Sequence, residues 1–173
     1  MAQRICILGN SGSGKSTLGK ALSKELNIPV LHLDRELLYE NFQKRSLEES
    51  LLLHEMLISQ ENWIIEGNYQ NLVPRRFERA TLVIFLNTSR LVTFPRVILR
   101  AGRGGQPKDT VPTGAKHNDL SWEFIKWVTG YKRKQRLQLL RALCEEHGVP
   151  FLALPNISTE KQVEAIKQAI KNA

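Results

Sequence analysis

The sequence predicts an α/β fold, in which helices cover both faces of a parallel β-sheet. Short apolar segments alternate with amphipathic segments along the chain, as expected when a helix follows each strand. The 173 residues are the size of one domain with one sizeable core. We therefore predict a single domain over residues 1–173, with a lid-like insertion at about residues 102–120.

Apolar runs predict five strands. They lie at residues 3–8, 30–33, 63–65, 81–86 and 151–154. The fourth run is apolar throughout, which is typical of a parallel strand buried on both faces. Because ligands bind outside the carboxyl ends of parallel strands, the residues that follow each strand are candidates for a site.

Apolar residues at helical spacing predict the helices between these strands. They lie at residues 16–26, 46 to about 60, 89–101, 121–148 and from 159 onwards. Ser46 with Glu49, and Thr159 with Gln162, form two capping boxes at helix starts. Pro95 is expected to bend or restart its helix, because proline removes a backbone donor.

Residues 9–16 read Gly-Asn-Ser-Gly-Ser-Gly-Lys-Ser, a full match to the phosphate-binding P-loop pattern. The match lies between a strand and an amphipathic helix, which is the context that the motif requires. Its backbone N–H groups form an anion-binding concavity, and the helix adds its positive end. Lys15 would reach the β- and γ-phosphates, and Ser16 would hold Mg²⁺. The residues expected to bind nucleotide are Gly9, Asn10, Ser11, Gly12, Ser13, Gly14, Lys15, Ser16 and Thr17.

Polar residues follow the second and third strands. The candidates for substrate contact are Asp34, Glu66, Gly67 and Asn68. The fourth strand ends in Asn87 and lacks the aspartate that usually completes a Mg²⁺ shell. Asp34 and Glu66 could hold a metal-bound water, or could orient a substrate hydroxyl and accept its proton. A turn cap is the structural alternative for Asp34, and packing is the expected role of His32.

One region carries the whole excess of positive charge. The chain has a net charge of +8, whereas residues 90–141 hold twelve Lys or Arg and three acids, a net charge of +9. This region is either a phosphate clamp that folds over a nucleotide or a nucleic-acid footprint. A solvated helix face is the third interpretation.

Arginines flank a glycine-rich connector at residues 102–107. Arg96, Arg100 and Arg103 are spaced to share a helix face that leads into it, and Arg133 and Arg136 follow on the next helix. Arginine binds phosphate through a planar fork, and a glycine-hinged segment with arginines at both ends suits a closing lid. The residues expected to act in catalysis are Lys15, Asp34, Arg96, Arg100 and Arg133.

Several classes of protein do not fit the sequence. It has no uninterrupted apolar stretch of about 18 residues, so no membrane span is expected, and its start does not resemble a signal peptide. Cys6 and Cys144 lie far apart in apolar contexts and are interpreted as core thiols in a reducing cytosol. We therefore expect a cytoplasmic protein.

The chain resembles the adenylate-kinase-like P-loop NTPases, and more closely the DNA topology modulation proteins among them. The matching stretches are residues 7–17, 30–34 and 63–69, the arginine-rich segment, and the aromatic residues Trp122, Phe124, Trp127 and Tyr131. The resemblance implies a three-layer P-loop fold with a five-stranded sheet in the order 2-3-1-4-5, and an arginine-rich lid between strands four and five. The likeness covers almost the whole chain.

The resemblance also implies a ligand set. ATP and Mg²⁺ would be held by Lys15 and Ser16, Asp34 would face the acceptor, and the arginines from Arg96 onward would close over the phosphates. The chain departs from the family pattern at Glu66, where aspartate is expected, so its reach is changed.

Two functions from different classes compete. The first is a kinase that transfers the γ-phosphate of ATP to a nucleoside, a nucleotide or a hydroxylated metabolite. The second is an ATP-dependent regulator that binds nucleic acid and changes DNA topology. We favour the kinase, because a lid explains the basic region without a second ligand, and because no helix-turn-helix, zinc-finger or RNA-binding motif is present.

Overall fold

Five parallel strands form one sheet in the order β2-β3-β1-β4-β5. They are β1 (Arg4–Gly9), β2 (Val30–His32), β3 (Trp63–Glu66), β4 (Leu82–Leu86) and β5 (Phe151–Leu154). The computed structural model describes residues 2–40, 43–102, 108–112, 122–130 and 132–172. The predicted strand order is confirmed.

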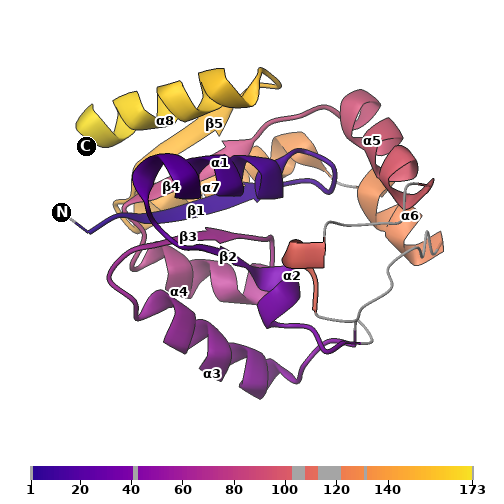
Figure 1. Ribbon diagram of the computed structural model, residues 1–173, viewed down its shortest axis with the longest axis horizontal. Coiled ribbons are helices and arrows are strands. Elements are labelled where there is room, and N and C mark those ends of the chain that lie inside the picture. Colours follow the sequence, from indigo (N-terminus) through magenta and orange to yellow (C-terminus); the bar gives the residue numbers. More distant parts are fainter. Residues whose placement is uncertain (1, 41–42, 103–107, 113–121, 131, 173) are drawn as a thin grey trace.

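Helices cover both faces of this sheet (Figure 1). Alternate side chains of β1 point to opposite faces, as they must in a strand. Ile5 and Ile7 join one core beneath α1 (Lys15–Leu26) and α8 (Thr159–Asn172). Cys6 and Leu8 join the other. That second core is covered by α3 (Leu47–Ile58), α4 (Val73–Phe77) and α7 (Arg133–Glu146).

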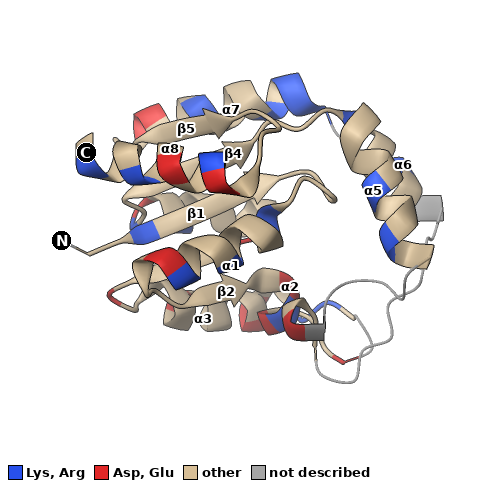
Figure 2. Ribbon diagram, turned by 45° about the horizontal axis from the view of Figure 1, so that its top comes forward, with Lys and Arg blue, Asp and Glu red and all other residues tan. Residues whose placement is uncertain are grey.

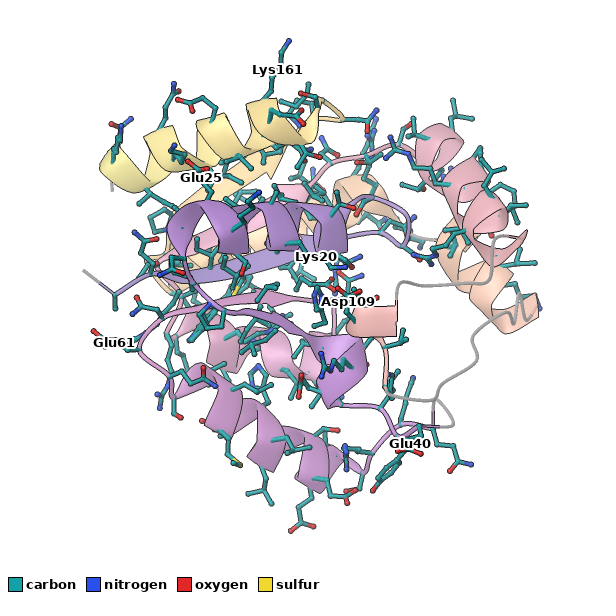
Figure 3. The ribbon with its side chains drawn as sticks, viewed as in Figure 1. Lys20, Glu25, Glu40, Glu61, Asp109 and Lys161 are labelled. Carbon is teal, nitrogen blue, oxygen red and sulfur yellow. The ribbon has the colours of Figure 1, made fainter. Side chains whose placement is uncertain are left out.

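Two further helices lie beyond the carboxyl ends of the strands, away from both termini (Figure 1). They are α5 (Arg90–Gly102) and α6 (Trp122–Gly130). The short segments near the same edge are α2 (Leu33–Glu36), η1 (Gln70–Leu72) and η2 (Lys108–Thr110). Asp109 of η2 and Lys20 of α1 point toward one another and form an ion pair of 2.6 Å (Figure 3). This pair joins the middle of the basic region to α1, the helix that follows the P-loop sequence.

Several local predictions were wrong. The single helix over residues 121–148 is two helices, α6 and α7, and Lys132, which precedes α7, has a ψ of 74°, outside the helical range. α5 runs through Pro95, so the helix does not restart there, and a bend at Pro95 stays a prediction. β2 ends at His32, so Asp34 lies in the first turn of α2.

The capping boxes had different outcomes. At the start of α3, Ser46 and Glu49 bond reciprocally, as predicted. At α8 the cap lies one residue earlier than expected, because Ser158 Oγ accepts from the Lys161 N–H at 3.5 Å. The box that was predicted from Thr159 is therefore wrong in register.

Some predictions fall outside the described residues. They concern the connector at 103–107, which includes Arg103, and the side chains of Trp122, Phe124, Trp127 and Tyr131. In the part of the chain that the structure describes, no helix is long and apolar enough to cross a membrane.

Candidate active site

The P-loop, residues 9–17, joins β1 to α1 and leaves a cradle that suits an anion. Gly12 and Gly14 have φ values of +74° and +98°, which L-residues rarely adopt. α1 has no side-chain cap and no acidic residue in its first turn, so its positive end is not neutralised. Ser13 Oγ is buried without a hydrogen-bond partner, and Thr17 is exposed. These features fit a bound polyphosphate.

Lys15 folds back across the loop. Its Nζ donates to the backbone oxygen of Asn10 at 3.0 Å. Desolvation lowers the pKa of Lys15, and the negative charges of Glu66 and Asp34 partly offset this effect. The ammonium group therefore lies between the loop and two carboxylates, where it can reach a transferred phosphoryl group.

The P-loop also contacts the two helices beyond the sheet. A Cβ added at Gly12 would lie 2.6 Å from the backbone oxygen of Thr93 in α5, so only glycine fits. Asn10 Nδ2 donates to the backbone oxygen of Val128 in α6 at 3.3 Å and to Thr93 Oγ1 at 3.4 Å. The position of α5 and α6 is thereby coupled to the shape of the phosphate cradle.

Glu66 lies at the end of β3, and its carboxylate contacts the hydroxyl of Ser16 in the P-loop. Its Oε1 accepts from Ser16 Oγ at 2.9 Å and lies 2.8 Å from Nδ1 of His32. Parallel pairing of β2 with β3 sets His32 directly opposite Glu66. Burial raises the pKa of Glu66, but the bond to His32, the charge of Lys15 and the bond from Ser16 outweigh it, so the net pKa is lowered. Glu66 is thus held as a carboxylate next to the hydroxyl expected to bind Mg²⁺.

Asp34 lies near these groups but in the opposite electrostatic setting. Its Oδ1 accepts from the hydroxyl of Tyr69 at 3.1 Å. Loss of water raises the pKa of Asp34, and so does the negative charge of Glu66, while Lys15 and the Tyr69 bond oppose the shift. A carboxylate with a raised pKa is suited to accept a proton.

Gly67 and Asn68 follow β3 in the chain, and Asn68 is hydrogen-bonded to Gly9 at the start of the P-loop. The side chain of Asn68 bonds both backbone groups of Gly9, accepting from N–H at 3.2 Å and donating to the oxygen at 2.8 Å. Gly67 has a φ of +134°, and a Cβ there would lie 2.9 Å from Leu33 Cβ. The buried guanidinium of Arg76 donates to the backbone oxygens of Gly67 and Asn68 at 2.9 and 3.3 Å. The side chain of Asn68 therefore holds the start of the P-loop through these two bonds, and its amide is not free to contact a substrate.

The predicted arginines separate into two groups. Arg100 is half-buried, and its Nη2 donates to Ser11 Oγ at 3.2 Å. Burial lowers the pKa of Arg100, while the two carboxylates of the site raise it, so it lies within their field. Arg133 Nη1 donates to the backbone oxygen of Asn87 at the end of β4, at 3.1 Å. Arg96 is exposed, and no hydrogen bond or ion pair of its side chain is found within the described ranges.

Sequence reasoning missed three members of this arrangement: His32, Tyr69 and Arg76. The signal for His32 was its place at the end of a strand next to the strand of Glu66, which needs the strand register to be read. The signal for Tyr69 was its place directly after Asn68 in the matching stretch of residues 63–69, and the sequence holds no comparable signal for Arg76. Within the described part of the chain, no three His, Cys, Asp or Glu side chains are grouped to hold a metal alone. A P-loop magnesium site does not need such a group, since phosphates and water supply most ligands.

The chain is similar to known proteins over most of its length. Residues 5–108 match the AAA_18 family model, described as an AAA domain. The uncharacterized protein YqaC of Bacillus subtilis (strain 168) is 33% identical over 164 residues, which cover 92% of this chain and 89% of that protein.

Three kinase structures share its fold. A shikimate kinase from Acinetobacter baumannii superposes with a TM-score of 0.61 at 16% identity, covering 97% of this chain and 92% of that one. A deoxyadenosine kinase from M. mycoides with bound dATP gives 0.53 at 17% identity, with coverage of 96% and 98%. A gluconokinase from Sinorhizobium meliloti 1021 gives 0.52 at 18% identity, with coverage of 94% and 88%. At these identities the likeness concerns the fold.

Proposed function

We propose that this chain, which belongs to the AAA_18 family of AAA domains, is a kinase that uses ATP and Mg²⁺ to phosphorylate a hydroxyl group of a small acceptor. The observation that carries the proposal is a pair of carboxylates at the P-loop with different partners: Glu66 accepts from the P-loop hydroxyl of Ser16 at 2.9 Å, and Asp34 accepts from Tyr69 at 3.1 Å. Two neighbouring acids with different protonation behaviour are suited to two different roles. The kinases that share the fold support the same class of reaction.

Ser16 and Glu66 are the groups proposed to hold the metal. Ser16 Oγ and Glu66 Oε1 already lie 2.9 Å apart, and hard oxygen ligands are those that Mg²⁺ prefers. When bound, Mg²⁺ would supply charge neutralisation between the β- and γ-phosphates. His32 holds Glu66 from the other side, so the carboxylate keeps its orientation.

Asp34 is proposed as the base. An acceptor hydroxyl next to it would give its proton to Oδ2 or Oδ1, while the hydroxyl oxygen forms a bond to the γ-phosphorus and the bond to the ADP oxygen breaks. Lys15 and Arg100 would stabilise the negative charge on the moving phosphoryl group. Tyr69, through its bond to Asp34, fixes the direction in which the carboxylate faces.

The proposal is tested by offering acceptors to the protein. Purified protein with Mg·ATP is mixed with a panel of nucleosides, nucleotides and hydroxylated metabolites, and products are read by mass. One acceptor should gain about 80 Da, the mass of the phosphoryl group that a kinase transfers. The gain should disappear in Lys15→Ala. ATP binding without a mass gain in any acceptor would contradict the proposal.

The closer resemblance to DNA topology modulation proteins stays a prediction, and so does binding of nucleic acid by the basic region. The cytoplasmic location also stays a prediction. Two of the predicted cations, Arg100 and Arg133, bond to the P-loop and to the end of β4 rather than standing free on the surface. Their placement supports a role over the phosphates, and we therefore keep the kinase as the proposed function.

A further inference from the structure

A hollow of about 380 Å³ lies beside the P-loop, between the end of β3 and the α6–α7 pair. Its walls include Asn68 and Gln70 from the segment after β3, Lys126 from α6, and Lys132 and Arg136 from the start of α7. Asn68 is the residue that clamps Gly9 of the P-loop. The hollow therefore adjoins the proposed active site through one shared side chain.

Positive charge dominates the walls of this hollow. Three of its lining residues are Lys126, Lys132 and Arg136, and none is acidic. Figure 2 shows Lys and Arg along α5 and at the first turn of α7. Arg136 is half-buried, and in the described part of the chain neither Arg136 nor Lys132 has a side-chain ion pair. Lys132 and Arg136, two cations in one hollow without an ion pair among the described residues, favour an anionic ligand.

A second hollow provides the contrast. It has a volume of about 710 Å³ and lies beside α2, where Arg35 and Arg45 are matched by Glu36 and Glu40. Arg45 also stacks over the ring of Tyr39, 4.4 Å from its centre. Its charges are balanced by the protein itself, so this hollow has no comparable demand for an anion.

Resting on the kinase function proposed above, we propose that the acceptor carries a phosphate or carboxylate group, which binds in the hollow at Arg136 and Lys132. Asp34 and the hollow are linked through two consecutive residues, Asn68 and Tyr69. Tyr69 bonds to Asp34, the proposed base, and the neighbouring Asn68 lines the hollow. An acceptor with its hydroxyl at Asp34 extends past this segment and places its anionic group against the guanidinium, which binds such groups bidentately.

The test uses acceptors in matched pairs. Each pair has a neutral and an anionic member: a nucleoside with its 5′-monophosphate, and a polyol with the corresponding hydroxy acid. Phosphoryl transfer and binding, measured by titration calorimetry, are compared for the wild type and Arg136→Met. We expect transfer to an anionic member, with a KM that rises about 10- to 100-fold in Arg136→Met, as the loss of a charge-assisted bond implies. Acceptor-independent ATP hydrolysis should change less than about twofold, because the hollow is not expected to hold ATP.

Two further variants control the test. Lys134→Met removes the same charge from an exposed position of α7 that does not line the hollow, and its KM should match the wild type. Lys132→Met removes a lining charge from an exposed position, so it repeats the test without disturbing the packing of Arg136.

The outcomes separate the two proposals. Transfer to neutral members with an unchanged KM in Arg136→Met would overturn the anionic acceptor and leave the kinase intact. No transfer to any member would contradict the kinase, and the absence of calorimetric binding of the anionic members would then overturn the hollow as well. Salt-dependent binding of duplex DNA that Lys134→Met and Arg136→Met weaken equally would assign the cations to a nucleic-acid surface and overturn the proposal.

Discussion

The ends of β2 and β3 each bring one carboxylate to the P-loop, but the two carboxylates are treated in opposite ways. At the end of β3, Glu66 receives a hydroxyl bond from Ser16 and faces the ring of His32, and its pKa falls. Just after β2, Asp34 accepts a bond from Tyr69 and lies in the field of Glu66, and its pKa rises. The contrast arises from the number of donors around each group rather than from the residue type.

This difference teaches how one edge of a sheet can host two chemical roles. A carboxylate that is saturated with donors stays ionised and is suited to a cation. A carboxylate that is poorly solvated and repelled by a neighbour binds a proton more readily. We expect the two roles to be separable by substitution, with the largest effect on the rate of transfer and the smallest on stability.

The largest effect is expected for Asp34→Asn. The amide can still accept the hydrogen bond from Tyr69, but it cannot take a proton from the acceptor. The rate of phosphoryl transfer should fall by about 10²- to 10⁴-fold, the range of general base catalysis. The KM for ATP should change less than about twofold, because ATP contacts are not removed. Steady-state kinetics at saturating Mg²⁺ measure both; an equal loss in ATP affinity would assign Asp34 to the nucleotide instead.

The next effect is expected for Glu66→Gln. The amide oxygen can still accept from Ser16, but the charge next to the metal site is lost. The Mg²⁺ concentration for half-maximal rate should rise about 10- to 100-fold, as for other groups that support a metal site. Excess Mg²⁺ should restore much of the activity. A rate that stays low at every Mg²⁺ concentration would show that Glu66 acts on the acceptor and not on the metal.

The P-loop clamp gives a smaller effect. Asn68→Ala removes both bonds to Gly9, each worth about 1 kcal/mol, so ATP affinity should fall by up to about 30-fold. Titration of ATP without acceptor measures this directly. Gln70→Ala, in the segment that follows, is the matched control and should leave ATP affinity unchanged. Equal losses in the two variants would argue for a general disturbance of the segment after β3.

The smallest effect lies in stability, and its sign differs between the two carboxylates. The raised pKa of Asp34 means that its ionised form destabilises the fold as pH rises above the ordinary value of 3.8. The lowered pKa of Glu66 means that its charge stabilises the fold above the ordinary value of 4.5, and that this stability is lost as pH falls through the lowered pKa. At pH 7, Asp34→Asn should therefore raise Tm and Glu66→Gln should lower it. Thermal unfolding at pH 7 checks the signs, and shifts of the same sign would contradict the contrast.

Local signals made much of this molecule predictable. The P-loop has a fixed spacing, and β4 is an apolar run, so both were found from neighbouring residues alone. The Ser46–Glu49 box was found for the same reason. The strand order came from family resemblance, since no local pattern fixes which strands are neighbours.

What was missed depends on contacts between distant residues. His32 reaches Glu66 only because two strands pair in one register. Arg76 holds the oxygens of Gly67 and Asn68 from a short helix whose sequence has no distinctive pattern. The division between α6, which ends at Gly130, and α7, which begins at Arg133, was missed because apolar residues on both sides were joined into one stripe. Two consecutive helices can be told from one long helix only when the phase of the apolar pattern is compared along the segment, as well as its spacing.

The most direct test of the two-role account is the rate of a single phosphoryl transfer as a function of Mg²⁺ concentration in the wild type, Asp34→Asn and Glu66→Gln. The account predicts that excess Mg²⁺ brings Glu66→Gln toward the wild-type rate, whereas Asp34→Asn stays slow at every concentration. Rescue of Asp34→Asn by Mg²⁺, or identical curves for the two variants, would contradict it.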